Sequence, residues 1–217
     1  MCGRYKLITE YKKIVKRYPL YAEELWEEFY RIHREINRVE IFPGELVLAI
    51  NNKYEPEMDW WTIRAETWDG KIANAINAKA ETVNKVQMFR EAFQKDRVLI
   101  PATSLFEWQL QNDGTKKKYE IWFDEPIFSF GGIARHCEIK GELKRCTAII
   151  TTSPNETFKL IHNTKQRQAV VIREADQEAW LDPNAKESDV MALMKPLPDS
   201  ETHFKEFEEE KAQGSLF

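Results

Sequence analysis

The longest run of strand-like sequence in this chain lies in its middle and constrains the fold more than any other feature. Stretches rich in β-branched and aromatic residues occupy 97–111, 117–123, 127–134 and 144–152. Asn112-Asp113-Gly114 separates the first two as a hairpin turn would. Helical patterns are not regularly interleaved with these strands, which argues against a parallel α/β sheet. The sequence predicts a mixed α+β fold around a mostly antiparallel, barrel-like sheet.

Shorter segments add strands to this sheet. Residues 46–50 follow Pro43-Gly44 and form a continuous apolar run, which is typical of a buried strand. Residues 58–63, with Trp60 and Trp61, and residues 168–172 show similar character. Residues 74–82 are small and polar with no period of 2 or 3.6, so we expect an ordered loop there.

Helical periodicity dominates the beginning of the chain. Two helices are predicted at 9–18 and 22–37, separated by Pro19. In the second, the spacing predicts one buried face, made of Leu25, Phe29, Ile32 and Ile36. Its other face is charged, and His33 on that face is expected to be inert.

Four more helices are expected later in the chain. Asn84 is positioned to cap a helix that ends near Lys95 and points Val86, Phe89 and Phe93 inward. Pro154-Asn155 opens a short helix that ends near His162. The other two span 174–181 and 186–195, and residues 196–217 form a charged, partly loose tail.

Size and composition bound the remaining possibilities. A chain of 217 residues with 42% hydrophobic residues fits one domain over 1–217. No apolar run approaches the ~20 residues of a membrane span, and no targeting segment is recognisable, so we expect a cytoplasmic monomer. Three cysteines without CxxC spacing and four scattered histidines argue against disulfides and metal. A net charge of −4 means that any DNA binding would need a local basic groove.

The most reactive candidate is Cys2. Once Met1 is removed, this residue carries a free α-amine and a thiol on adjacent carbons. The amine has an ordinary pKa of about 8, against about 10.4 for lysine, so a sizeable minority is unprotonated near neutral pH. Such a pair can attack an aldehyde, forming a Schiff base that the thiol closes into a thiazolidine ring. Cysteine could equally stand at this position by chance.

Four other features could carry chemistry, and each has an ordinary structural alternative. Asn77-Ala78-Lys79-Ala80-Glu81-Thr82 could present a buried amide or form a simple turn. Glu107 interrupts an apolar strand and is either outward-facing or buried with a raised pKa. His162 at a helix end is a proton shuttle or a structural histidine. Thr151-Thr152-Ser153 offers hydroxyl donors or leads into a helix.

Taken in order, these segments resemble the SOS response-associated peptidase (SRAP) family. The resemblance is carried by Met1-Cys2-Gly3-Arg4-Tyr5, the Asn77–Thr82 segment, Pro101-Ala102 through Phe106-Glu107-Trp108, and Ile161-His162-Asn163 followed by Arg167 and Val170-Val171-Ile172. It spans most of the chain and is weaker in the C-terminal helices. It implies an SRAP-like fold and covalent recognition of abasic sites in single-stranded DNA, with no cofactor and no metal.

The resemblance also implies roles for individual residues. The protein would remove its own Met1, the peptidase activity, and Cys2 would then form a thiazolidine with the ring-opened sugar, a lyase-type crosslink. Asn77 would orient the Cys2 amine, Glu107 would act as general acid and base, and His162 would move protons at the sugar oxygen. The DNA contacts would come from Arg4, Lys79, Trp61, Trp68, Trp108, Thr151 and Arg167, although core packing is an equal alternative for Trp61 and Trp108.

The chain departs from the family pattern at two places. Lys79 stands where the family usually has arginine, which would replace a bidentate phosphate contact by a point charge. Arg167-Gln168-Ala169 replaces the usual Arg-Met-Pro, and the missing proline affects a turn near His162.

Two other functions fit parts of the sequence. Class II glutamine amidotransferases also expose Cys2 as a nucleophile, but their glycine-rich substrate loops and second domain are not recognisable here. A non-catalytic reader of single-stranded or junction DNA on the same fold would show salt-sensitive binding but no covalent adduct.

Overall fold

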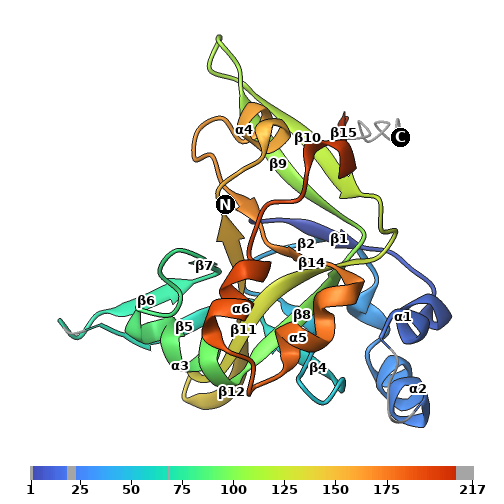
Figure 1. Cartoon of the computed structure of the whole chain (residues 1–217), viewed down its shortest axis with the longest axis vertical. Helices are drawn as coiled ribbons and strands as arrows, with labels where there is room; N and C mark the ends of the chain where they lie inside the picture. The colour runs from blue at the N-terminus through green and yellow to red at the C-terminus, as the bar shows by residue number, and fades with distance from the viewer. Residues whose placement is uncertain (1, 19–22, 68, 209–217) are drawn as a thin grey trace, which may run out of the picture.

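A closed β-barrel forms the centre of the molecule, as expected from the sequence. The computed structural model describes residues 2–18, 23–67 and 69–208 (Figure 1). The pairings β12–β4, β4–β3, β3–β8, β8–β11 and β11–β12 close a ring of five strands. These strands are β3 (Leu46–Ile50), β4 (Pro56–Trp60), β8 (Arg97–Ala102), β11 (Phe128–Ile139) and β12 (Glu142–Thr152). Within this ring only β4 and β12 run parallel, and they meet at Cys146 opposite Trp60.

A second antiparallel sheet lies against the barrel. Its strand order is β15-β10-β9-β1-β2. The bounds are β1 (Tyr5–Leu7), β2 (Arg38–Ile41), β9 (Ser104–Leu110), β10 (Lys116–Phe123) and β15 (Thr202–Glu206). The predicted turn at Asn112-Asp113-Gly114 joins β9 to β10, and Gly114 supplies the required positive φ of 83°. The prediction of a partly loose tail over 196–217 is therefore wrong at Thr202–Glu206, which form β15. Residues 209–217 lie outside the described residues.

Short strands replace several expected segments. The predicted strand 58–63 covers parts of two strands, β4 and β5 (Ile63–Glu66). Strand β5 pairs with β6 (Ile72–Ala75) in a hairpin. The predicted loop 74–82 contains β7 (Asn77–Lys79), which runs parallel to β12. Three residues are too few to show a period, so no pattern marked this strand. The predicted strand 168–172 is interrupted at Val170, giving β13 (Gln168–Ala169) and β14 (Val171–Ile172).

Helices surround the two sheets close to the predicted places. They are α1 (Tyr11–Arg17), α2 (Glu23–Ile32), η1 (Arg34–Ile36), α3 (Gln87–Lys95), α4 (Glu156–Ile161), η2 (Glu174–Asp176), α5 (Gln177–Leu181), α6 (Glu187–Leu193) and η3 (Asp199–Glu201). Helix α3 packs against β8 and β11, α5 packs against β8, and α4 packs against β9. Figure 1 shows α4 beside the projecting β9–β10 hairpin. Pro19 lies outside the described residues.

Two helix details differ from the predictions. The buried anchor of α2 is Trp26, fully enclosed, whereas Ile32 is 57% exposed. Trp26 lies three residues before Phe29, so the buried face is rotated from the predicted one. Asn84 does not cap α3, because Val86 occupies the N-cap position and the Asn84 amide bonds Glu187. Phe89 and Phe93 are buried as expected.

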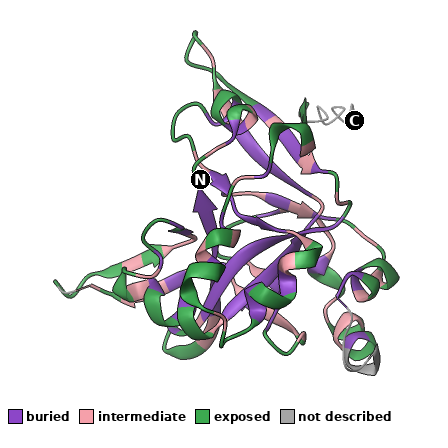
Figure 2. Ribbon diagram, in the orientation of Figure 1, coloured by how far each residue is buried: buried purple, intermediate pink, exposed green. Residues whose placement is uncertain are grey.

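The core fills the barrel and the space between the two sheets. Figure 2 shows the barrel strands buried along most of their length, while the tips of the β5–β6 and β9–β10 hairpins are exposed. Tyr5 of β1 packs edge-on against both Trp61 and Phe130, with ring centroids 5.3 and 5.5 Å away. This contact joins the N-terminal strand to the barrel. Strand β1 is therefore fixed by the core.

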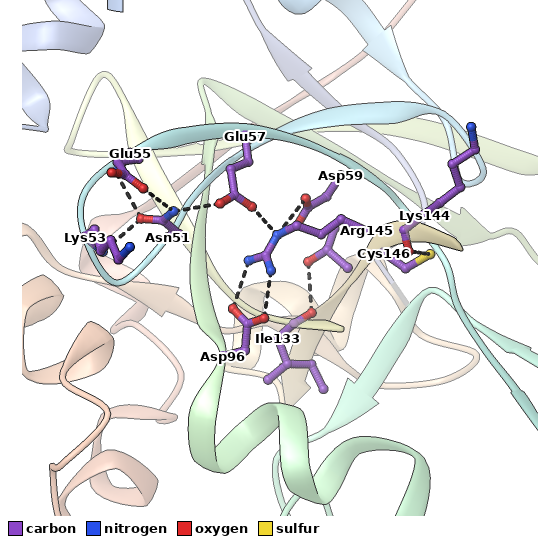
Figure 3. A network of polar contacts seen from close by, with 11 residues as sticks. Asn51, Lys53, Glu55, Glu57, Asp59, Asp96, Ile133, Lys144, Arg145 and Cys146 are labelled. Atoms are coloured by element: carbon purple, nitrogen blue, oxygen red, sulfur yellow. Dashed lines mark hydrogen bonds and ion pairs between the residues drawn. The ribbon is translucent and has the colours of Figure 1, made fainter. Parts of the chain in front are cut away.

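A partly buried ionic cluster crosses the parallel β4–β12 seam (Figure 3). The guanidinium of Arg145 on β12 contacts Glu57 and Asp59 on β4, and forms two hydrogen bonds of 2.7 and 2.8 Å with Asp96 at the end of α3. Asp59 is fully buried, and burial raises the pKa of its carboxyl to about 7 against the attraction of Arg145. The cluster thus ties the one parallel junction of the barrel to a helix.

Two classes of feature are missing from the described part of the chain. No helix in these ranges is long and apolar enough to cross a membrane. Over the same residues, no three His, Cys, Asp or Glu side chains gather in a way that could hold a metal ion.

Candidate active site

Cys2 lies in the interior, just before β1. Its side chain is fully buried, and the side-chain amide of Asn77 donates a 2.9 Å hydrogen bond to its carbonyl oxygen. Asn77 is held in turn by the parallel pairing of β7 with β12. Burial raises the pKa of the Cys2 thiol, and the nearby negative charge of Glu107 raises it further. The thiol is therefore neutral at physiological pH.

Glu107 comes from β9, which pairs with β1. Its side chain is buried, and burial raises the pKa of the carboxyl to about 8. Most of the population therefore keeps its proton at pH 7. A buried neutral carboxylic acid can donate a proton and later take one back, which the outward-facing alternative would not provide.

His162 follows the last residue of α4 and faces Glu107. Its Nε2 lies 3.8 Å from Oε2 of Glu107. Its Nδ1 lies 2.8 Å from the carbonyl oxygen of Arg167. Because a carbonyl can only accept, Nδ1 carries the hydrogen. Burial lowers the pKa of the imidazole, so the ring is neutral at pH 7 and Nε2 is a proton acceptor.

An open cleft of about 250 Å³ reaches this group. It is lined by Ile76, Glu107, Trp108, Leu110, Lys116, His162, Thr164 and Lys165. Two of these residues are lysines, which give the mouth of the cleft positive charge although the whole chain is acidic. The arrangement combines a proton donor, a proton acceptor and cations around one opening.

Arg4 and Trp108 form a cation–aromatic cluster beside the cleft. The Arg4 guanidinium lies 4.2 Å from the ring centre of Phe42 and 5.2 Å from that of Trp108. It also forms an ion pair of 3.0 Å with Glu40, which Lys118 shares at the same distance. Because Glu40 lies on β2, this strand helps to position the Arg4 side chain.

The remaining predicted DNA contacts occupy different environments. Lys79 is exposed at the end of β7, whereas Thr151 is buried and its hydroxyl donates to the Ala78 carbonyl. Trp61 is fully buried and its indole donates to the Ile76 carbonyl, so it is a core residue that is not accessible to a base. Trp68 lies outside the described residues.

Arg167 is half-buried, and its guanidinium makes several contacts within the chain. Two of its nitrogens bond both carboxylate oxygens of Glu81 at 2.7 and 2.8 Å, and one also bonds the Thr151 carbonyl. No role for Glu81 was predicted from the sequence. Lys116 and Lys165 were also missed, although the lysine run at 116–118 directly after the hairpin turn was a visible signal of positive charge.

Fold and site together define an α+β barrel protein in which a buried second-position cysteine is bonded by a half-buried asparagine and lies near a buried glutamate that faces a buried histidine. The sequence pattern of the family described as SOS response associated peptidase (SRAP) matches residues 1–210, and the chain belongs to that family. The family membership expected from the motifs is thereby confirmed.

Several relatives are similar over most of their length. The chain is 30% identical to the abasic site processing protein YoqW of Bacillus subtilis, over 90% of this chain and 87% of that protein. It is 26% identical to the abasic site processing protein YedK of Escherichia coli, over 83% and 79% of the two chains. A crystal structure of a Bacteroides thetaiotaomicron protein superposes with a TM-score of 0.81 at 25% identity, covering 95% of this chain and 92% of that one.

Proposed function

We propose that this chain senses abasic sites in single-stranded DNA and joins to them covalently through Cys2. The observation that carries the proposal is the hydrogen bond from Asn77 to the Cys2 backbone, beside the facing pair of Glu107 and His162. The relatives named as abasic site processing proteins support the substrate class. An abasic site in its open form carries an aldehyde, which is the partner that an amine and a thiol on adjacent carbons select.

The first step of the proposed reaction is hydrolysis of the Met1–Cys2 peptide bond. Until that bond is cleaved, the nitrogen of Cys2 is an amide and cannot form a Schiff base. Water adds across the bond, giving free methionine and the α-amine of Cys2. Glu107, mostly protonated at pH 7, would donate a proton to the departing nitrogen and recover one from the attacking water.

The second step joins the amine to the aldehyde carbon. The carbonyl adduct loses water to give an imine, and Glu107 supplies the proton that the departing hydroxyl needs. The thiol then adds across the C=N bond, so that sulfur bonds to carbon and its proton goes to nitrogen. His162 would take the proton of the sugar hydroxyl at Nε2 and return it to the ring oxygen during ring opening.

The DNA strand would follow the positive mouth of the cleft. Lys116, Lys165 and the exposed Lys79 are suited to phosphates, and Trp108 offers an aromatic face at the rim. Arg4 would hold Trp108 and take part in phosphate binding. Local charge rather than the net charge of −4 would then decide binding.

The test is a denaturing gel and an intact mass after mixing mature protein with single-stranded DNA that contains one abasic site. The wild type should give a covalent species and Cys2→Ala none, whereas Cys137→Ala and Cys146→Ala should behave as wild type. An undamaged strand is the substrate control. Salt-sensitive binding without any adduct would contradict the proposal and favour the non-catalytic reader.

A further inference from the structure

A pair of cysteines on neighbouring barrel strands takes no part in the reaction proposed for Cys2. Cys137 on β11 and Cys146 on β12 are buried, and neither forms a disulfide. In the register of the two strands Cys137 lies opposite Lys144, so Cys146 is its diagonal neighbour on the same face of the sheet. A side-chain hydrogen bond joins the two thiols. Residues 138–145 separate them in the sequence, so the pair does not show the CxxC spacing of common dithiol sites.

The hydrogen bonds around the two sulfurs distinguish them. The backbone N–H of Arg64 donates to Sγ of Cys137 at 3.3 Å. Sγ of Cys146 lies 3.6 Å from the Lys144 carbonyl oxygen, which can only accept, so Cys146 keeps its hydrogen. The corresponding contact of Cys137, with the Arg135 carbonyl, is longer at 4.0 Å. Cys137 is therefore the sulfur that is surrounded by donors.

Access and positive charge complete the environment of Cys137. This residue lines an open cleft of about 450 Å³. Among the lining residues, basic side chains outnumber acidic ones: Arg64, Arg135 and Lys140 against Glu66 and Glu138. The hydrogen bond from Cys146 and the charge of Arg135 lower the pKa of the Cys137 thiol against the effect of burial. A thiolate in such surroundings is the reactive form of cysteine, whereas a buried neutral thiol is inert.

We propose that Cys137 is a site of oxidative modification by peroxides and that Cys146 is its resolving thiol. The Cys137 thiolate attacks one oxygen of hydrogen peroxide, an S–O bond forms as the O–O bond breaks, and the leaving hydroxide takes up a proton to become water. The Cys146 sulfur then attacks the sulfur of this sulfenic acid, and the oxygen leaves with the Cys146 proton as a second water. In sum, two thiols are oxidised to one disulfide while one peroxide is reduced to two waters.

The position of the pair makes the resulting disulfide easy to reduce. The Cα atoms of diagonal neighbours lie about 7–8 Å apart, beyond the roughly 4.4–6.8 Å of an ordinary disulfide, so the strands must approach each other to close the bond. Pairing of β11 with β8 ends at Ile133, and β12 meets β4 at Cys146, so the hairpin between these points extends past the barrel ring and has room to adjust. A strained disulfide is readily reduced, and the modification is therefore reversible.

The test is a peptide map of the reduced full-length protein before and after treatment with hydrogen peroxide, with remaining thiols alkylated. Trypsin cleaves after lysine and arginine, which places Cys137 in residues 136–140 and Cys146 in residues 146–159. The wild type should lose two hydrogens, about 2 Da, and give these two peptides joined by a bond that dithiothreitol breaks. Oxidised protein in which the two peptides stay unlinked would overturn the proposal.

Variants test the roles of the two sulfurs separately. Cys146→Ser should still react with peroxide and leave a sulfenic acid at Cys137, which a 1,3-dione probe traps. Cys137→Ser should give no such product at Cys146, because that thiol keeps its hydrogen. Trapping at Cys146 and not at Cys137 would overturn the assignment of the two roles.

Cys2 is an internal control in the same protein. Its thiol is fully buried and burial raises its pKa, so peroxide should modify it at least ~10-fold more slowly than Cys137. Equal rates at Cys2 and Cys137 would contradict a selective site. Cys2→Ala should form the Cys137–Cys146 disulfide as the wild type does. The disulfide needs no DNA adduct, so this proposal and the proposed function fail independently.

Discussion

Two buried carboxyl groups in this molecule have raised pKa values but very different surroundings. Asp59 lies at the β4–β12 seam beside Arg145, and burial raises its pKa to about 7 (Figure 3). Glu107 lies beside the neutral imidazole of His162, and burial raises its pKa to about 8. Only Glu107 lines the cleft. A perturbed pKa therefore marks burial, and its combination with access to a ligand is what indicates chemistry.

The largest expected effect concerns the seam. Arg145→Met should lower the free energy of unfolding by about 3 kcal/mol, because it leaves the buried Asp59 and the half-buried Glu57 and Asp96 without their cation. His162→Ala should change the free energy of unfolding far less and abolish most adduct formation. Urea unfolding of both variants checks the contrast. A similar loss of stability in Arg145→Met and His162→Ala would show that His162, like Arg145, mainly stabilises the fold.

A smaller, pH-dependent effect is expected at the cleft. Glu107 has a folded-state pKa of about 8 against an ordinary 4.5, so the folded protein binds more protons than the unfolded chain between these values. Its contribution to stability therefore falls as pH rises through that window. Glu107→Gln should be more stable than wild type by about 1–3 kcal/mol at pH 8 and by little at pH 4.5.

The same variant should lose activity while it gains stability. Removing a general acid and base typically slows a reaction by about 10²–10⁴-fold. Thermal unfolding at the two pH values, with adduct formation measured in parallel, tests both halves. Equal stability of wild type and Glu107→Gln at pH 8 would mean that the pKa of Glu107 is not raised in the folded protein.

The smallest effect on activity is expected for Asp59→Asn. Its folded-state pKa of about 7, against an ordinary 3.8, spans a window nearly as wide as that of Glu107, and Arg145 keeps its contacts with Glu57 and Asp96. The gain in unfolding free energy at pH 8 should therefore be similar, about 1–3 kcal/mol. Adduct formation should match wild type. A large loss of activity in Asp59→Asn would show that Asp59, like Glu107, is needed for the reaction.

The strands of the barrel were predictable because each is long enough to display its pattern. The apolar runs at 46–50 and 144–152 are buried on nearly every residue. Strand β7 was not predictable, because its three residues gain their structure only from pairing with β12, more than seventy positions later. The wrong placement of Ile32 on the buried face has a similar cause, since Trp26 is buried by contacts that the helix alone does not contain, whereas Phe29 and Ile36 pack against the core as predicted.

The site was predictable to a lesser extent. The motifs pointed to Cys2, Asn77, Glu107 and His162, but no pattern could show that the Asn77 amide bonds Cys2 itself. The pairing of Glu81 with Arg167 joins residues 86 positions apart, so local sequence carries no trace of it. Trp61 was predicted to contact DNA but is a core residue. The sequence alone does not distinguish a tryptophan that packs in the core from one that faces a ligand.

Strand β15 has a consequence beyond completing a sheet. It pairs with β10 over Thr202–Glu206 and covers backbone groups that would otherwise form an open edge. Shortening the chain to residue 201 would leave the N–H and C=O groups of β10 available to a strand from another molecule. β15 thus closes the β10 edge and leaves its own five residues as the outer strand of the sheet.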